Sequence, residues 1–250
     1  MSGTTDIRAT VREKYGALAE GGAGCCDGSG CGCGDAAGTV LTAIGYTPEQ
    51  AAAIPEGANL GLGCGNPLAH ANVKQGETVL DLGSGAGIDA FLAAREVGPR
   101  GRVIGVDMTP AMLDRARKNA AEGGYTTVEF RLGEIEHLPV ADGAVDLIIS
   151  NCVVNLSPQK DQVFREAYRA LKPGGRMLVS DLVLEAPLPK EIKESIEAYV
   201  GCIAGASMKE DYLRLIREAG FENVEIVRSG AYGDAPVTSV QVRAVKPATR

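Results

Sequence analysis

The chain has 250 residues, of which 45% are hydrophobic and 23% are charged, a composition typical of a globular protein with a full hydrophobic core. Its net charge of −7 argues against nucleic acid as the main partner, because phosphate binding needs a basic face. No apolar run approaches the ~20 residues of a membrane span and no secretory signal is visible, so we expect a cytoplasmic protein without a membrane partner.

Two segments are expected to precede the main domain. Residues 1–38 combine an amphipathic helix, expected to pack on the core, with a flexible glycine-rich arm that carries the Cys25-Cys26 pair. Residues 39–72 contain a short helix that Thr47 caps and a glycine-rich loop that holds Cys64. The main domain then spans residues 73–250.

In this domain, apolar strands alternate with amphipathic helices. The patterns predict strands over 78–82, 102–107, 127–132, 144–151 and 176–184, and helices over 88–97, 110–122 and 159–171. Two more helices, over 190–203 and 208–219, precede closing strands over 224–228 and 238–244. This alternation indicates an α/β fold with a parallel, doubly wound sheet, whose ligands bind at the carboxyl ends of the strands.

The first strand and the first helix of the domain are joined by a turn of alternating glycines. Gly83, Gly85 and Gly87 lack a Cβ, so a ligand can touch the main chain there. Asp107 ends the neighbouring strand, where an acid is placed to accept hydrogen bonds from a ribose. The dinucleotide spacing G-x-G-x-x-G and the lysine of a phosphate loop are both absent from the sequence.

Asp81 followed by this G-x-G-x-G turn is similar to motif I of the class I methyltransferases that use S-adenosylmethionine. Four further pieces follow in the same order: Asp107, Gly133–Glu136, the strand that ends at Asn151, and Leu171–Gly175. The resemblance covers roughly residues 73–245. It implies a Rossmann-like, seven-stranded, mostly parallel sheet with helices on both faces and an antiparallel last strand.

The same motifs suit S-adenosylmethionine as the cofactor. The amides of the glycine turn are placed to face its carboxylate and Asp81 its amine, while Asp107 suits the ribose. Glu134 is placed to accept a hydrogen bond from the adenine amino group, between Met108 and Ile135 that sandwich the ring. The predicted cofactor-binding residues are Asp81, Gly83, Ser84, Gly85, Gly87, Asp107, Met108, Glu134, Ile135 and Asn151.

Three cysteines bear on the methyl acceptor. Cys64 precedes the first strand, Cys152 follows the fourth, and Cys202 lies near the end of a helix after the fifth, so they can converge above the methyl group. Three thiolates without histidine favour a soft centre. Zinc usually takes four ligands, whereas trivalent arsenic takes three in a pyramid and keeps a nucleophilic lone pair at its apex. Methyl transfer to that lone pair needs orientation and proximity but no general base.

The segments around these cysteines resemble those of the microbial arsenite methyltransferases, namely Gly63–Pro67, Asp81–Gly87, Ser150–Leu156 and Gly201-Cys202, and the Cys25-Cys26 pair resembles an N-terminal pair of that family. The resemblance implies that Cys152 and Cys202 ligate arsenic, that Cys64 ligates it or forms a transient disulfide, and that a helical insertion around 186–219 belongs to the arsenic site. It also implies arsenite or thiol-bound arsenite as substrate, methylated arsenicals as products of arsenic detoxification, and thioredoxin or glutathione as reductant.

Two alternatives stay open on the residues themselves. An ordinary small-molecule C- or O-methyltransferase would use the same cofactor motifs and keep the cysteines as packing residues. In the other alternative, the arm is a metal- or metalloid-binding module, because Cys25-Cys26 and Cys31-Gly-Cys33 lie close together in the sequence.

Overall fold

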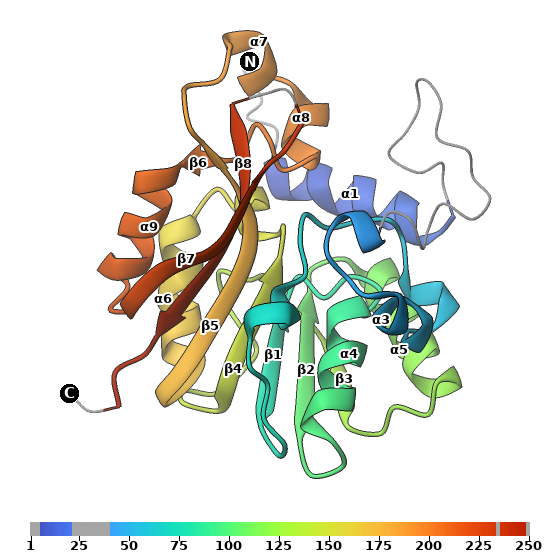
Figure 1. Cartoon of the computed structure of the whole chain (residues 1–250). Coiled ribbons are helices and arrows are strands. Elements are labelled where there is room, and N and C mark those ends of the chain that lie inside the picture. The colour runs from blue at the N-terminus through green and yellow to red at the C-terminus, as the bar shows by residue number, and fades with distance from the viewer. Residues whose placement is uncertain (1–5, 22–40, 234–235, 249–250) are drawn as a thin grey trace.

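A computed structural model describes residues 6–21, 41–233 and 236–248, and these form one mixed sheet between layers of helices (Figure 1). The strands are β1 (Thr78–Leu82), β2 (Arg102–Asp107), β3 (Val128–Leu132), β4 (Val145–Asn151), β5 (Leu171–Leu184), β6 (Ser207–Met208), β7 (Glu222–Ala231) and β8 (Val237–Val245). The sheet order is β3-β2-β1-β4-β5-β8-β7, and β6 pairs with β5 outside this path.

The strand directions match the predicted topology. Strands β1 to β5 pair in parallel, whereas β8 is antiparallel to both β5 and β7. The α/β fold class, with a mostly parallel sheet and an antiparallel last strand, is therefore confirmed. The two-residue strand β6 was not predicted, and it forms where Ser207 and Met208 pair in parallel with the end of β5.

The helices are α1 (Ile7–Ala19), α3 (Pro48–Ala53), α4 (Ile88–Val97), α5 (Pro110–Glu122), α6 (Lys160–Ala170), α7 (Lys190–Lys193), α8 (Ile196–Val200) and α9 (Lys209–Glu218), with short 3-10 helices at Glu56–Ala58, Pro67–His70 and Val154–Leu156. Local signals place several of their ends. The Thr47 hydroxyl accepts the Gln50 N–H at 3.2 Å, and the Gln50 side chain accepts the Thr47 N–H at 3.0 Å, which forms a capping box at α3. Gly98, with φ of 69°, ends α4.

The sheet separates two hydrophobic cores because successive strand residues point to opposite faces. Leu80 and Ile148 pack with α6 and α9 on one face, whereas Val79 and Leu147 pack with α4 on the other. All four of these side chains are fully buried. Burial of each such side chain stabilises the fold by about 1.5–3 kcal/mol. The sheet is therefore a rigid platform for the loops at its carboxyl edge.

Two parts of the sequence-based prediction were wrong. The single helix expected over 190–203 is divided into α7 and α8, because the Ser195 hydroxyl accepts the Ala198 N–H at 3.1 Å and starts a new helix. The strand expected over 176–184 begins earlier, at Leu171, where the preceding helix was expected to end, so that β5 has 14 residues. The predicted arm, with Cys25, Cys26, Cys31 and Cys33, lies outside the described residues, and the boundaries after residues 38 and 72 stay predictions. Within the described ranges, every helix is too short or too polar to cross a membrane.

Candidate active site

A cavity opens at the carboxyl edge of β1, β2 and β4, with an empty volume of about 1050 Å³ that includes its open mouth. It lies where a doubly wound sheet is expected to bind its ligand. Eight of the ten predicted cofactor residues line its wall: Asp81, Gly83, Ser84, Gly85, Asp107, Met108, Ile135 and Asn151. The structure thus brings together residues that lie far apart in the sequence.

The glycine turn shapes the floor of this cavity. Gly83 has φ of 67°, and a Cβ there would clash with the side chain of Val153. The Gly85 N–H donates to Asp107 Oδ2 at 3.0 Å, while the Thr109 N–H donates to Oδ1 at 2.8 Å, so the Asp107 carboxylate is held in place. Gly87 is outside the wall: it precedes α4, and a Cβ there would lie 2.6 Å from the Phe91 ring. Glycine at this position therefore permits close packing of the helix, and its predicted contact with the cofactor stays a prediction.

Buried acids give the cavity its charge. Asp81 is only 2% exposed, and its Oδ2 has no hydrogen-bond partner among the described residues. Burial, and then the nearby charges of Asp89 and Asp107, raise the pKa of Asp81 well above its ordinary value. Burial also raises the pKa of Asp89, which lines the wall, to about 6. A buried carboxylate without a partner is costly, so this cavity favours a ligand whose positive charge compensates that of the carboxylate.

Helix α1 closes one side of the cavity. Arg8, Val11 and Tyr15 belong to the wall, and Val11 is buried there. Glu134 lies outside the wall, and its carboxylate accepts a hydrogen bond from Arg12 Nη2 of α1 at 3.2 Å. The predicted contact of Glu134 with an adenine ring therefore stays a prediction, whereas its neighbour Ile135 does line the cavity.

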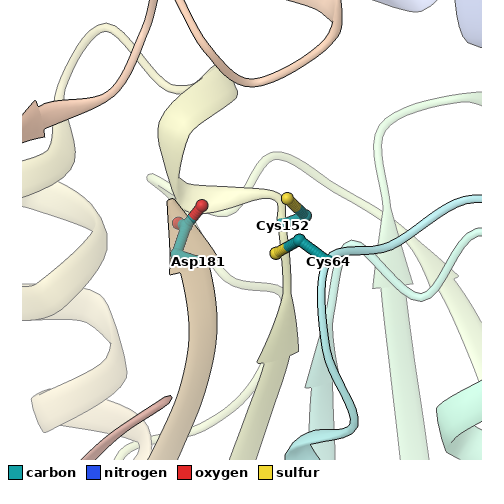
Figure 2. Close-up of side chains that lie close together, drawn as sticks. All are labelled: Cys64, Cys152 and Asp181. Atoms are coloured by element: carbon teal, nitrogen blue, oxygen red, sulfur yellow. The ribbon is translucent and has the colours of Figure 1, made fainter. Parts of the chain in front are cut away.

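The three predicted cysteines meet beside the cavity. Cys64 is 5% exposed, Cys202 is 3% exposed, and half-buried Cys152 belongs to the same apolar cluster and also lines the cavity. The Cys202 thiol donates to the Cys152 carbonyl at 2.8 Å. Figure 2 shows that Asp181 on β5 lies close to Cys64 and Cys152, and the ligand atoms of these three residues are all within 4.8 Å of one another. Sequence reasoning missed Asp181, although an acid inside a long apolar strand was a visible signal.

The backbone and the thiol pKa values mark this cluster as unusual. Cys152 and Cys202 have φ of 61° and 65°, a left-handed conformation that costs non-glycine residues about 1–3 kcal/mol and concentrates at functional sites. Burial raises the pKa of Cys64. Hydrogen bonds to the Cys202 and Cys64 thiols, together with burial, hold the pKa of Cys152 well above its ordinary value. The surroundings of Cys64 and Cys152 therefore favour the neutral thiol over the thiolate.

One hydrogen-bond network joins the cavity to the loop that holds Cys64. The Asn151 amide donates to the Tyr46 hydroxyl at 2.9 Å, and its Oδ1 accepts the Cys64 N–H at 3.1 Å. The Tyr46 hydroxyl donates in turn to Asp89 Oδ1 at 2.8 Å. The sequence carried no signal for Tyr46, whereas Asp89 was visible as an acid in the helical turn that follows the glycine motif. Asn151 thus positions the thiol loop relative to the cavity.

Comparison with known proteins agrees with this geometry. Residues 73–220 match the family described as a methyltransferase domain. The chain is 52% identical over 231 residues to an arsenite methyltransferase of Halobacterium salinarum. The aligned region covers 88% of this chain and 59% of the relative. It is 38% identical over 152 residues to an arsenite methyltransferase of Homo sapiens, which covers 57% of this chain and 40% of the relative. The chain thus spans between 40% and 59% of the length of these two relatives.

Solved structures show the same relationship. An arsenic(III) S-adenosylmethionine methyltransferase from Chlamydomonas reinhardtii superposes with a TM-score of 0.64 at 36% identity, over 83% of this chain and 74% of that one. A phosphoethanolamine N-methyltransferase of Haemonchus contortus, solved with S-adenosylhomocysteine, superposes with a TM-score of 0.63 at 21% identity, over 74% of this chain and 53% of that one. At that level of identity, the second likeness concerns the fold alone.

Proposed function

The chain belongs to the arsenite methyltransferase family of class I methyltransferases, and on that premise we propose that it transfers methyl groups from S-adenosylmethionine to trivalent arsenic held by cysteine thiolates. The observation that carries this proposal is the convergence of Cys64, Cys152 and Cys202 beside the cavity. Cys152 belongs both to this cysteine cluster and to the cavity wall. An ordinary organic acceptor would need no such group of thiols.

The residues of the cavity fit S-adenosylmethionine, which supplies a methyl group activated by a positive sulfonium. The unpartnered Oδ2 of Asp81 supports binding of its ammonium group by a charge-assisted hydrogen bond. The carboxylate of Asp107, which two backbone N–H groups orient, supports binding of the ribose hydroxyls. Met108 lines the cavity and also packs in the cysteine cluster, so the two binding regions are continuous.

The neutral thiol form, which the surroundings of Cys64 and Cys152 favour, suits the uptake of arsenous acid, As(OH)₃, which is also uncharged. Three thiols replace its three hydroxyls, and each S–H proton leaves with one hydroxyl as water. The balance is one As(OH)₃ and three thiols giving one arsenic trithiolate and three waters. No net charge then has to enter the apolar cluster around Cys64, Cys152 and Cys202, which avoids a large desolvation cost.

The lone pair of the bound arsenic would then attack the methyl carbon of S-adenosylmethionine. An As–C bond would form, the S–C bond would break, and S-adenosylhomocysteine would leave with the electron pair of that bond, so that arsenic changes from trivalent to pentavalent. Orientation and proximity are the protein's contribution to this step, and they come from the common position of Cys152 in both regions. Two enzyme thiols return two electrons to arsenic by forming a disulfide. Thioredoxin or glutathione reduces that disulfide and restores the thiols for a further transfer.

The test is methyl transfer from labelled S-adenosylmethionine to arsenite, with Cys152→Ser and Cys202→Ser beside the parent protein. We expect both variants to lose arsenic methylation while binding S-adenosylhomocysteine with the parent affinity, because serine is not a soft ligand. Variants that methylate arsenite at the parent rate would show that the thiolate mechanism is wrong. A parent protein that binds the cofactor but labels no arsenical would favour an organic acceptor.

A further inference from the structure

We infer that Cys64, Cys152 and Asp181 form a binding site for a thiophilic divalent cation of the zinc and cadmium class. Two sulfurs and a carboxylate oxygen lie within 4.8 Å of one another in this cluster (Figure 2). Zinc binds these donor types at about 2.3 Å for sulfur and about 2.0–2.2 Å for oxygen. A small inward movement of the three side chains therefore brings them to bonding distance, and a fourth position remains for water.

Asp181 has the surroundings of a metal-binding carboxylate. It is 1% exposed on β5, and its two oxygens accept hydrogen bonds from the Leu182 N–H at 2.9 Å and from the Tyr212 hydroxyl at 3.2 Å. Outer partners of this kind orient a ligating carboxylate. The Tyr212 side chain is itself fully buried, so this orientation is fixed by packing.

Asp181 also has no counter-ion in direct contact in the described part of the chain. Among the residues that the structure describes, no lysine or arginine forms an ion pair with Asp181. The Lys160 ammonium donates to the Ser157 carbonyl at 3.0 Å and attracts the Asp181 carboxylate through space, without a direct ion pair. A buried carboxylate beside two thiols is costly without a cation, and a divalent ion at the cluster compensates that charge.

This donor set differs from the one proposed for arsenic. Trivalent arsenic bonds to three thiolates and has no use for a carboxylate, whereas the cation takes Asp181 in place of Cys202. Cys64 and Cys152 belong to both sets, so the two ligands exclude each other. The cation should therefore inhibit arsenic methylation. That expectation rests on the proposed function, whereas the cation site itself does not.

Cadmium is the probe, and the readout is the ultraviolet charge-transfer band between thiolate and cadmium. The 250-residue chain is kept reduced and carries serine in place of Cys25, Cys26, Cys31 and Cys33, so that the arm binds no cadmium. We expect Asp181→Asn to weaken cadmium binding at least about tenfold, since loss of even an outer-shell partner costs about 10- to 100-fold. Cys202→Ser is expected to keep the parent affinity for cadmium and to lose arsenite binding.

Asp114→Asn, an exposed acid on α5, is the matched control, and far-ultraviolet circular dichroism checks that each variant is folded. Cadmium binding by Asp181→Asn at the parent affinity would overturn the inference, and so would an equal loss in Cys202→Ser. Should Asp181→Asn not fold, Tyr212→Phe tests the same point, with an expected weakening of about tenfold or more. Cadmium NMR of the unchanged cluster must report two sulfur ligands with oxygen, and a three-sulfur signal would refute the site.

Discussion

The replacement Asp81→Asn tests whether the acidic cavity binds a cationic group, through two effects of opposite sign. Asparagine has almost the same shape as aspartate, but it carries no charge. In the absence of ligand, the variant should be more stable than the parent, because the buried Asp81 carboxylate has an unpartnered Oδ2 and lies near Asp89 and Asp107. The variant should also bind S-adenosylhomocysteine more weakly than the parent does, because the ammonium group of this ligand would lose the charged partner that we propose for it.

The size of the binding effect follows from the type of interaction. Hydrogen bonds to charged groups contribute about 1.5–3 kcal/mol, which corresponds to about a 10- to 150-fold increase in Kd. The sign of the stability effect follows from linkage. The pKa of Asp81 is raised in the folded protein, so its cost to the folded state grows as the pH rises above the unfolded value. The stability gained by Asp81→Asn should therefore be larger at about pH 8 than at about pH 5.

Isothermal titration with S-adenosylhomocysteine measures the affinity, and urea denaturation without ligand measures the free energy of unfolding. Asp114→Asn, which removes an exposed acid on α5, should change neither quantity. General misfolding would lower both stability and affinity, so it cannot imitate the expected pair of results. Parent affinity in Asp81→Asn, or a lower free energy of unfolding than the parent, would refute the assignment of Asp81 to the ammonium group.

Three further changes probe the same site. The pKa of Asp89 is about 6 in the folded protein against an ordinary 3.8, so deprotonation of this buried carboxyl destabilises the fold as the pH rises from about 4 to about 6. Denaturation across that range should show a fall of about 3 kcal/mol in the free energy of unfolding, and Asp89→Asn should remove that fall. Gly83→Ala should abolish S-adenosylhomocysteine binding, because the added Cβ clashes with Val153. Gly85→Ala, whose Cβ would have its nearest neighbour 4.0 Å away, should fold and carry only backbone strain. Equal affinities of the two variants would contradict the close approach of Val153 to Gly83. Tyr46→Phe should lower the free energy of unfolding by about 1–3 kcal/mol, because Asp89 loses a buried donor, and an unchanged urea midpoint would count against the network.

Features that depend on a few neighbouring residues could be predicted from the sequence. The capping box at Thr47, the stop at Gly98 and the glycine turn arise from contacts within about one helical turn, so their residue types are sufficient signals. The alternation of strands and helices then implied a parallel sheet, and parallel strands carry their carboxyl ends to one edge. For that reason the meeting of Asp81, Asp107 and Cys152 at one cavity could be anticipated.

Contacts between distant side chains could not be predicted. Tyr46 and Asp89 are 43 residues apart, and Cys64 and Asn151 are 87 residues apart, yet both pairs share hydrogen bonds in one network. Residue pattern and spacing carry no information about such pairs, because these contacts form only when helices, strands and loops pack together. The same holds for α1, whose amphipathic pattern predicted packing on the core but not its place in the cavity wall.

The sequence by itself determined the fold class, the cofactor motifs and the three cysteines of the cluster, because residue type and order specify local conformation and the topology of a parallel sheet. Only the tertiary structure decided that Asp181 joins those thiols and that Cys152 and Cys202 adopt left-handed backbone conformations. The physical reason is that both features are sustained by the packing of β5, the Cys64 loop and the segment around α8 against one another, and no local stretch contains those contacts.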